Sequence, residues 1–523
     1  QIHGCLYSHK LINNFNISFV DTKQIVPEDV LFNIEALLMA NSASFLPLPL
    51  YYHVQTGSNT GSTLSYFEWD KRRKAIAEVE RFLKEKGIER GDKVAVQAHH
   101  DKYCVALYYA IHLIGAILVP LEKNAPEIRA REIIADADAK LVFSNLSVED
   151  ENWHTYAEIE KVCEDKIEYD YDDLTFPDID DLCEMVFTTG TTGKSKGVLI
   201  SHRNISWYAY ALAKAIHMKE DNRFFITTPL NHAGGLRRTH LSLANGCAMV
   251  YMDGLLNLKK YFEYIEKYSV TALYLPPVAI RLLVTSTKDE LHRFADQIDF
   301  VYSSSSPLPI GDCEELKRLL PKTRLYNAYE ASETPGVSVY DYNTDNMLKN
   351  CMGQPNPGVE LAILDDDGNI TKDAGVEGQI CIKSPMNMQG YYKAPELTAE
   401  VMHGEWYVSS DLGVFDEDGN IYYNGRKGDV INIGGYKISP IDVEEVALLG
   451  GTIKECICVL STNKRGYPIL KLLVVPKDEE FNARELIGFI GTRLEPYKVP
   501  KEVEIIEEVH KTFNGKIDRK YYR

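Results

Sequence analysis

The chain has 523 residues, more than one hydrophobic core usually supports, so its length predicts several domains. Hydrophobic residues make up 45% and charged residues 25% of it, which excludes a disordered, collagen-like or disulfide-stapled protein. The net charge of −19 makes it a poor candidate for binding nucleic acid through phosphates. The cysteines are scattered without a CxxC pair and no signal-peptide pattern is evident, so we expect a cytoplasmic protein.

A helical pattern of apolar residues covers 66–86 and is followed by Gly87, a candidate C-cap. Strand-like runs then alternate with helical ones as far as residue 326, which predicts layered α/β structure with largely parallel strands. The uncharged run 104–121 approaches the length of a membrane span. It contains His112, Gly115 and Pro120, so we interpret it as a buried helix leading into a buried strand.

Beyond about residue 350 the strands become short, and the acidic turns 365–369 and 416–420 are typical of β-hairpins. Calcium binding is not expected in these turns, because Ile363 and Val414 stand where acidic ligands are needed. The C-terminal segment shows a small α+β pattern, with strands at 455–460, 470–475 and 502–507 and a helix at 483–494.

The strongest chemical signal is the segment 187–197, FTTGTTGKSKG, between an apolar strand and an amphipathic helical stretch that begins at His202. Its glycines let backbone N–H groups approach an anion, while threonine hydroxyls and lysines add donors and charge. It is not a Walker A loop, because Thr188 stands where that motif needs glycine. We predict a phosphate-binding loop whose contacts come from Thr188, Thr189, Gly190, Thr191, Thr192, Gly193 and Lys196.

This loop resembles the phosphate loop of adenylate-forming enzymes, a superfamily of acyl- and aryl-CoA synthetases, nonribosomal peptide adenylation domains and luciferases. Other segments resemble further motifs of that family in the same order: 114–121, 326–333, 406–411, 425–431 and 512–519. The resemblance implies an α/β fold with a large N-terminal domain, residues 1–427, of layered α/β subdomains and a β-rich subdomain. It also implies a small, mobile α+β domain at residues 428–523.

The resemblance also implies the roles of individual residues. Asn327 would bind the adenine amino group, Tyr329 would stack on the ring and Ser332 would contact the α-phosphate. Asp411 and Arg426 would bind the ribose hydroxyls. An amide that reads a base edge and an aromatic face that covers it suit an adenine site.

Catalysis is implied for three groups. Glu333 would hold Mg²⁺, because a carboxylate is a hard oxygen ligand. Lys516 would be the catalytic lysine, and His232 would lie at the entrance of the acyl pocket. Between the two reaction steps the C-terminal domain would rotate about Gly428, a residue that tolerates wide backbone changes, and bring the Gly434-Gly435 segment to the thiol tunnel.

The chain departs from the family pattern in the expected acyl pocket. Ser303, Ser304 and Ser305 begin a segment that is glycine-rich in the family, and Glu330 replaces a small glycine. The added bulk and polarity favour a short or polar acid over a long fatty chain. No FDxS segment is found, which argues against an α-amino acid, although Glu330 could still pair with an amine elsewhere on the substrate.

We therefore expect an ATP- and Mg²⁺-dependent enzyme that converts a small-molecule carboxylic acid to acyl-AMP and then transfers it to coenzyme A. An alternative is a stand-alone adenylation enzyme that loads the phosphopantetheine arm of an acyl or peptidyl carrier protein. A non-catalytic nucleotide- or acyl-binding protein on the same fold is a third hypothesis. A P-loop NTPase is disfavoured by the missing Walker glycine.

Overall fold

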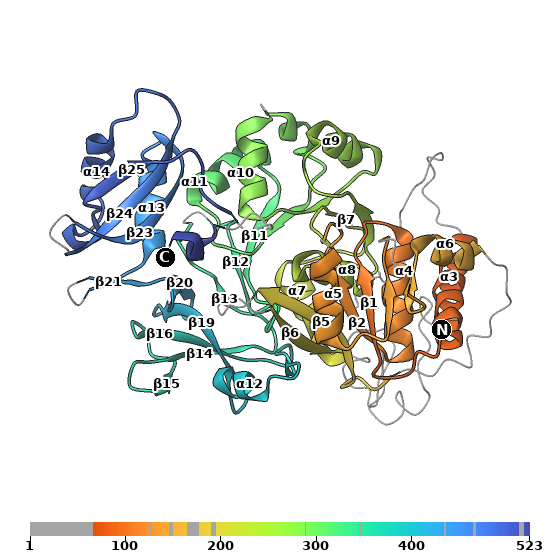
Figure 1. Ribbon diagram of the computed structural model, residues 1–523. Coiled ribbons are helices and arrows are strands. Elements are labelled where there is room, and N and C mark those ends of the chain that lie inside the picture. The colour runs from red at the N-terminus through yellow and green to blue at the C-terminus, as the bar shows by residue number, and fades with distance from the viewer. Residues whose placement is uncertain are drawn as a thin grey trace.

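The computed structural model describes residues 66–125, 127–145, 150–164, 177–189, 195–287, 289–344, 347–433, 436–463, 467–511 and 517–522. Within these ranges the strands form five sheets, two of them seven-stranded (Figure 1). The two large sheets and their helices make up the body of the molecule, and the C-terminal elements lie at the opposite end from α3 (Figure 1).

The first seven-stranded sheet has the order β17-β6-β5-β2-β1-β3-β4. Its strands from β5 to β4 run parallel, while β6 and β17 run antiparallel to their neighbours. The strands are β1 (Lys93–Gln97), β2 (Ile117–Leu121), β3 (Leu141–Phe143), β4 (Trp153–His154), β5 (Leu182–Thr189), β6 (Ser195–Ser201) and β17 (Gly390–Tyr391). The flanking helices are α3 (Tyr66–Glu85), α4 (Lys102–Ile114), α5 (Glu127–Ala137) and α6 (Tyr156–Glu164).

The second seven-stranded sheet has the order β13-β12-β11-β10-β9-β7-β8, and the strands from β11 to β8 are parallel. The strands are β7 (Arg223–Ile226), β8 (Ala248–Tyr251), β9 (Ala272–Tyr274), β10 (Phe300–Ser303), β11 (Arg324–Tyr329), β12 (Ser338–Asp341) and β13 (Gln354–Pro355). Its outer face packs against α9 (Leu258–Lys267), α10 (Pro277–Ser286) and α11 (Ile310–Leu319).

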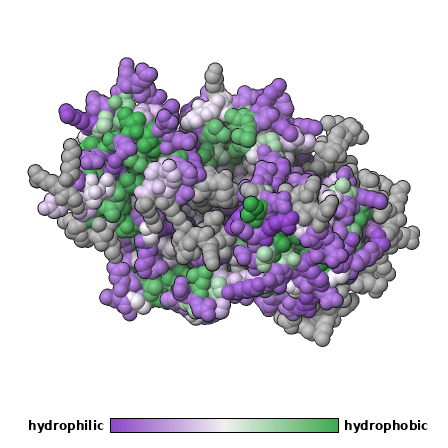
Figure 2. Space-filling model, viewed as in Figure 1, coloured by the Kyte–Doolittle hydropathy of each residue, from purple (hydrophilic) through white to green (hydrophobic). Residues whose placement is uncertain are grey.

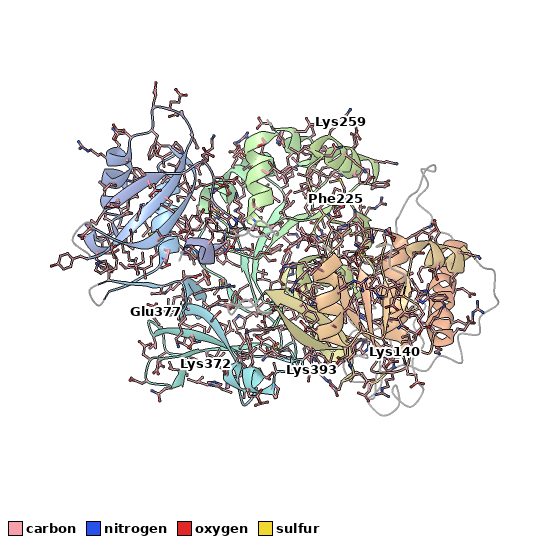
Figure 3. The ribbon with its side chains drawn as sticks, in the orientation of Figure 1. Lys140, Phe225, Lys259, Lys372, Glu377 and Lys393 are labelled. Carbon is pink, nitrogen blue, oxygen red and sulfur yellow. The ribbon has the colours of Figure 1, made fainter. Side chains whose placement is uncertain are left out.

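Side chains on this outer face show how the layer is built (Figure 3). Phe225 of β7 is buried and stacks on Tyr261 of α9 with 5.0 Å between ring centroids. Lys259, on the same helix, points to solvent with 89% of its side chain exposed. The alternation of apolar and charged residues along α9 thus covers the sheet with one face and meets water with the other.

Helices α7 (His202–Ala215) and α8 (Ala233–Ala244) lie between the two large sheets, and their apolar residues share one core with both. Every residue of α8 from Gly234 to Leu243 is buried. A helix enclosed on all sides usually contains apolar residues only, so the polar side chains of α8 need partners inside the protein.

The structure confirms the sequence-based prediction of layered, largely parallel α/β units as far as residue 326. It also confirms the interpretation of 104–121, because α4 ends at Ile114 and the chain re-enters the sheet as the fully buried β2. None of the described helices is both long and apolar enough to cross a membrane.

A six-stranded antiparallel sheet of the order β15-β14-β16-β19-β18, with β20 paired to β19, forms the β-rich part of the large domain as a half-barrel. Its elements are β14 (Glu360–Leu364), β15 (Ile370–Thr371), β16 (Glu377–Lys383), α12 (Pro395–Val401), β18 (Met402–His403), β19 (Trp406–Phe415) and β20 (Ile421–Arg426). Both predicted hairpins are present. Their turns use Gly368 and Gly419 at φ 86° and 80°, a region that favours glycine. Among the described residues, no three or more His, Cys, Asp or Glu side chains gather in a group that could hold a metal ion.

The C-terminal elements form a small α+β unit with its own core. They are β21 (Ile431–Ile433), β22 (Tyr436–Ile438), α13 (Pro440–Leu449), β23 (Ile453–Thr462), β24 (Pro468–Pro476), α14 (Ala483–Gly491) and β25 (Glu502–Ile505). Figure 2 shows apolar residues on the visible surface of this unit. Two large apolar side chains of the unit, Leu460 and Ile505, are 53% and 62% exposed. One ion pair, Lys349 with Glu445 at 2.8 Å, connects α13 to the large domain.

Candidate active site

The candidate phosphate loop joins β5 to β6, two antiparallel strands whose last paired residues are Thr189 and Ser195. The predicted helix after the loop is present, since α7 begins at His202, but the strand β6 lies between the loop and this helix and was not predicted. Thr188 and Lys196 lie opposite each other in the register of this hairpin, beside the segment 190–194. The residues Gly190, Thr191, Thr192 and Gly193 lie outside the described residues.

Lys196 and Glu333 approach the same tyrosine. The Nζ of Lys196 lies 5.1 Å from the ring centroid of Tyr391, and the Tyr391 hydroxyl donates a hydrogen bond of 3.0 Å to Oε1 of Glu333. Burial and the Glu333 carboxylate both raise the pKa of Tyr391, so this hydroxyl remains a donor. No sequence motif indicated a role for Tyr391. This residue reaches the site because β17 pairs with β6 at the edge of the sheet.

The candidate ribose ligands are in contact with the candidate adenine residue. The Tyr329 hydroxyl donates to Oδ2 of Asp411 at 2.8 Å, and Nε of Arg426 donates to Oδ1 of the same carboxylate at 3.0 Å. Asp411 raises the pKa of Arg426. The bulge in the β19–β20 ladder between Asp411 and Gly413 sets Asp411 opposite Arg426.

Tyr407 of β19 connects the two groups. Burial raises its pKa, and the neighbouring Glu333, Tyr391, Tyr329 and Asp411 raise it further. Tyr407 also hydrogen-bonds Tyr391, so one side chain lies within electrostatic range of both the Glu333–Tyr391 pair and the Tyr329–Asp411 pair. The structure thus brings five sequence-predicted residues into one neighbourhood: Lys196, Tyr329, Glu333, Asp411 and Arg426.

Asn327 and Ser332 take different positions. Ser332 is half-buried in the turn that follows β11, next to Glu333. Asn327 is buried, and its amide lies against the segment after β10. In the orientation that satisfies both bonds, its nitrogen donates to the Ser303 carbonyl at 3.1 Å and its oxygen accepts from the Leu308 N–H at 3.2 Å. These bonds fix the serine segment after β10. They are a separate role of Asn327 from the adenine contact that the resemblance implied.

The candidate acyl-pocket residues meet at the first turn of α8. His232 is the N-cap of this helix, and its Nδ1 accepts from the Gly234 N–H at 3.1 Å. A Cβ on Gly234 would lie 3.3 Å from the Tyr274 hydroxyl, which in turn shares a 2.9 Å hydrogen bond with Oγ of Ser304. Ser303 is buried as well, whereas Ser305 is exposed and has φ 86°.

A buried arginine that the sequence reasoning missed lies at this site. Arg238 of α8 has no exposed side-chain area and forms an ion pair with Glu330, whose side chain is 12% exposed. The guanidinium also donates to Oγ of Ser304 at 3.2 Å. Its ring neighbours are Tyr208, Tyr274 and Tyr302. The sequence contained little sign of it, because arginines are mostly exposed in proteins and the segment 233–244 mixes apolar residues with Arg, Thr, His and Ser.

The adjacent Arg237 faces the other large sheet and pairs with Glu184 of β5, which is fully buried. His240 Nε2 contacts the same carboxylate at 2.5 Å, and its Nδ1 shares a 2.7 Å hydrogen bond with the Tyr109 hydroxyl. Burial alone would raise the pKa of Glu184, but the charge of Arg237 and the contact with His240 hold it below its usual value. Two consecutive arginines of α8 therefore connect the helix to both sheets.

At the C-terminal end, Lys516, Gly434 and Gly435 lie outside the described residues. The candidate pivot Gly428 is exposed in the turn between β20 and β21, where the Asp429 N–H donates to the Arg426 carbonyl at 2.8 Å. Arg519 follows the lysine segment and makes a bidentate pair with Glu444 of α13, at 2.8 and 2.5 Å. This pair anchors the end of the chain to the C-terminal core.

Comparison with known proteins identifies the family. One family model, the AMP-binding enzyme, matches residues 50–392, and a second, the AMP-binding enzyme C-terminal domain, matches residues 442–516. The chain is 27% identical over 477 residues to a feruloyl-CoA synthase of Amycolatopsis sp, covering 89% of this chain and 94% of that protein. It is 28% identical over 499 residues to a long-chain-fatty-acid–CoA ligase of Bacillus subtilis, covering 84% and 86%.

Among solved structures, the fold is similar to that of ATP-bound MatB from Rhodopseudomonas palustris. The TM-score is 0.80 at 21% identity, and the match covers 87% of this chain and 92% of that one. The family models, the relatives and the shared fold agree with the resemblance noted in the sequence. The chain belongs to the AMP-binding enzyme family of ATP-dependent, AMP-forming acid–CoA ligases.

Proposed function

We propose that this protein activates a short or polar carboxylic acid with ATP, releases pyrophosphate, and transfers the acyl group from acyl-AMP to coenzyme A. The observation that carries the proposal is the contact of Tyr329 with Asp411 and of Asp411 with Arg426, beside Glu333. These residues come from three motifs far apart in the chain. Their neighbourhood offers an aromatic face, ribose acceptors and a metal ligand at one site.

In the first step the substrate carboxylate attacks the α-phosphorus, and the bond to the pyrophosphate oxygen breaks. Two anions must approach each other, so the site has to neutralise negative charge. We assign this task to the threonine and lysine loop flanked by Thr188 and Lys196, and to Lys516. The protein then acts mainly by positioning and electrostatics.

Glu333 suits Mg²⁺, which binds proteins through one or two carboxylates and otherwise keeps water or substrate phosphates as ligands. The hydrogen bond from Tyr391 occupies one lone pair of the carboxylate and leaves the others available. When bound, the ion would neutralise charge on the phosphates. Tyr391 would hold the carboxylate in one orientation, as partners of metal ligands commonly do.

In the second step the thiol attacks the acyl carbon and AMP leaves. We propose that the C-terminal domain, residues 428–523, rotates about Gly428 between the steps, so that Lys516 moves out and Gly434-Gly435 moves to the thiol tunnel. The position of Gly428 in an exposed turn between two sheets supports this role.

We also infer a reducing, cytoplasmic setting. Cys456 and Cys458 are adjacent on one face of β23, and both are buried free thiols. Burial raises the pKa of both, which keeps them protonated and unreactive. Such thiols are common in proteins of reducing compartments.

The first step is tested by ATP–pyrophosphate exchange with a broad panel of acids. We expect Asp411→Asn to raise the KM for ATP about tenfold or more, because an amide cannot accept hydrogen bonds on both sides and leaves Arg426 unpaired. Asp418→Asn, the same change in the exposed hairpin turn that follows, is the control and should leave the kinetics unaltered. Absence of exchange with every acid would contradict the proposal and favour a binding protein.

The second step separates coenzyme A from a carrier protein as acceptor. Preformed acyl-AMP enzyme is offered free coenzyme A or a purified holo-carrier protein at equal thiol concentration. We expect thioester formation with coenzyme A. Transfer to the carrier alone would overturn the choice of acceptor and leave the adenylation step intact.

A further inference from the structure

The buried pair Arg238–Glu330 lies where the acyl group is expected to end. Glu330 follows Tyr329 directly, so it sits between the candidate adenine residue and the helix α8. The pair lies near the expected pocket entrance, because a Cβ on Gly234 would meet both His232 Nδ1 and the Tyr274 hydroxyl, at 3.2 and 3.3 Å. The Tyr274 hydroxyl and Arg238 both bond Oγ of Ser304, and Arg238 pairs with Glu330.

The environment of the guanidinium is aromatic as well as charged. Its carbon lies 4.5 Å from the ring centroid of Tyr274 and 4.6 Å from that of Tyr302. The Tyr302 hydroxyl donates to Oε2 of Glu330 at 3.4 Å. Burial lowers the pKa of Arg238, but Glu330 and the tyrosines outweigh this effect and raise it, so the guanidinium stays charged.

Two buried polar atoms here have no hydrogen-bond partner among the described residues: Nε of Arg238 and Oγ of Ser303. An N–H left unpaired in a protein interior is costly, so a ligand that brings an oxygen to it is favoured. A purely aliphatic tail would cover both atoms without pairing them. The unpaired groups therefore favour a substrate with a polar atom at its far end.

The charges of Arg238 and Glu330 further restrict the class of substrate. Arg238 and Glu330 neutralise each other, so a second carboxylate on the substrate would compete with Glu330 for the guanidinium and leave one anion unpaired. An ammonium group would compete with Arg238 in the same way. Burying an unpaired charge is strongly unfavourable, whereas a hydroxyl or carbonyl adds no charge.

On the basis of the proposed function, we propose that the Arg238–Glu330 pair recognises the distal end of the acyl group, and that the substrate is a short acid with a neutral oxygen group there. Hydroxyl, phenol, ketone and carboxamide groups belong to this class. Dicarboxylic acids, amino acids with a distal ammonium group and long fatty acids do not. Glu330 then determines specificity by neutralising an arginine that would otherwise attract anions.

The test uses two sets of acids that differ only at the distal position. The aliphatic set is pentanoate, 4-hydroxybutanoate, glutarate and 4-aminobutanoate, and the aromatic set is 4-methylbenzoate, 4-hydroxybenzoate, terephthalate and 4-(aminomethyl)benzoate. Long-chain fatty acids are included for comparison. We expect the hydroxy acid of at least one set to exceed its methyl and charged counterparts by tenfold or more in kcat/KM for ATP–pyrophosphate exchange.

Two variants change the charges of the Arg238–Glu330 pair, and a third variant is the control. Glu330→Gln leaves the arginine charged and should shift selectivity toward the dicarboxylic acid by tenfold or more, with the KM for ATP unchanged. Because this variant leaves a buried charge unpaired and can unfold, the double variant Arg238→Met with Glu330→Gln removes both charges and should shift selectivity toward the methyl-ended acid. Asp299→Asn is the control. Asp299 pairs with Arg324 at 2.7 Å and precedes the first residue of β10, whereas the pocket residue Ser303 is the last residue of that strand.

The outcomes separate this inference from the proposed function. Exchange with dicarboxylic or long-chain acids as the best wild-type substrates, or a selectivity unchanged in both Glu330 variants, would overturn the role of the pair while adenylation stands. Exchange with no acid of any kind would remove both. A selectivity shift in Asp299→Asn equal to that in Glu330→Gln would show a general loss of structure and would also overturn it.

Discussion

At the scale of single residues, Ser305 is strained. Its φ of 86° lies in the left-handed region that favours glycine, and the family motif has glycine at this place. We expect Ser305→Gly to raise the free energy of unfolding by about 1 kcal/mol, because relief of the left-handed strain exceeds the added chain entropy of glycine. Urea unfolding followed by fluorescence measures the change.

The neighbouring Ser306 provides a matched control, since its φ is not positive. Ser306→Gly should lower the free energy of unfolding by about 0.5 to 1 kcal/mol, because glycine only adds freedom to the unfolded chain there. If both variants moved stability in the same direction, the strain at Ser305 would not be the cause.

Tyr391 is a second residue whose role follows from one contact. Loss of its hydroxyl in Tyr391→Phe removes the hydrogen bond to Glu333 and frees the carboxylate to rotate. We expect the Mg²⁺ concentration needed for half-maximal exchange to rise about tenfold, as is common when a metal ligand loses its partner. Titration of pyrophosphate exchange with Mg²⁺ at saturating ATP measures it.

Tyr392→Phe is the adjacent control, because the Tyr392 hydroxyl bonds the exposed Asp138 at 2.6 Å instead. This variant should leave the Mg²⁺ dependence unaltered. An equal shift in both variants, or in neither, would contradict the orienting role of Tyr391.

These residues also show what single-residue reasoning from sequence could reach. Tyr329, Glu333, Asp411 and Arg426 carry motif signatures, and the fold brings them together. Tyr391 has no signature, because its place depends on the edge pairing of β17 with β6, a contact between residues about 190 positions apart in the chain. Pairing across such separations is fixed by tertiary structure.

At the scale of elements, the strand β6 was not expected. Its residues 195–201 include two serines, one lysine and a glycine, a composition typical of a loop, yet Val198 and Ile200 are completely buried. The neighbouring strands β5 and β17 supply hydrogen-bond partners that cannot be inferred from the local sequence. The parallel strands before it were predictable, because strands buried on both faces are continuous apolar runs.

For helix α8 the element was predictable from sequence, but its packing partners were not. A helical pattern with two adjacent arginines does not indicate which sheet each arginine contacts. The structure shows that one arginine pairs with each sheet. Because both ion pairs are buried, removing either acidic partner would leave an uncompensated charge in the core.

The buried histidines beside α8 make stability depend on pH. Burial lowers the pKa of His202, at the start of α7, to about 4, although Asp181 and Glu184 raise it and His240 lowers it further. His112 lies against it with ring centroids 5.6 Å apart. Because the unfolded histidine titrates near pH 6.5, it takes up a proton as the pH falls from about 6.5 toward 4, while the folded one stays neutral.

Stability from this group is therefore complete above pH 6.5 and is lost as the pH falls toward 4. We expect the urea midpoint at pH 5 to lie clearly below that at pH 7.5, with up to about 2 kcal/mol of the difference due to His202. His202→Gln should reduce the difference, and His403→Gln, at an exposed position, should not. A pH slope identical in His202→Gln and the native chain would rule out this histidine.

At the scale of the whole molecule, the C-terminal unit has its own core and is connected to the large domain through the turn at Gly428. Length alone predicts more than one domain, and the order of the motifs predicts a division after residue 427, which stays a prediction. The contacts between the two parts, such as Lys349 with Glu445, could not be predicted, because surface charges carry no information about which partner they meet. Burial raises the pKa of Glu445 in this contact, although Lys349 opposes the effect.

The last prediction follows from the rotation proposed for the C-terminal unit. Proline at position 428 would fix φ near −65° and restrict Lys427 as well, while the β20–β21 turn itself tolerates a bend. We expect Gly428→Pro to slow thioester formation by about tenfold or more, with pyrophosphate exchange retained, because only the second step needs the rotated orientation. Gly428→Ala should lie between the proline variant and the native chain. The two half-reactions are measured separately, by exchange and by thioester formation from preformed acyl-AMP. Equal impairment of both, or of neither, would show that the pivot lies elsewhere.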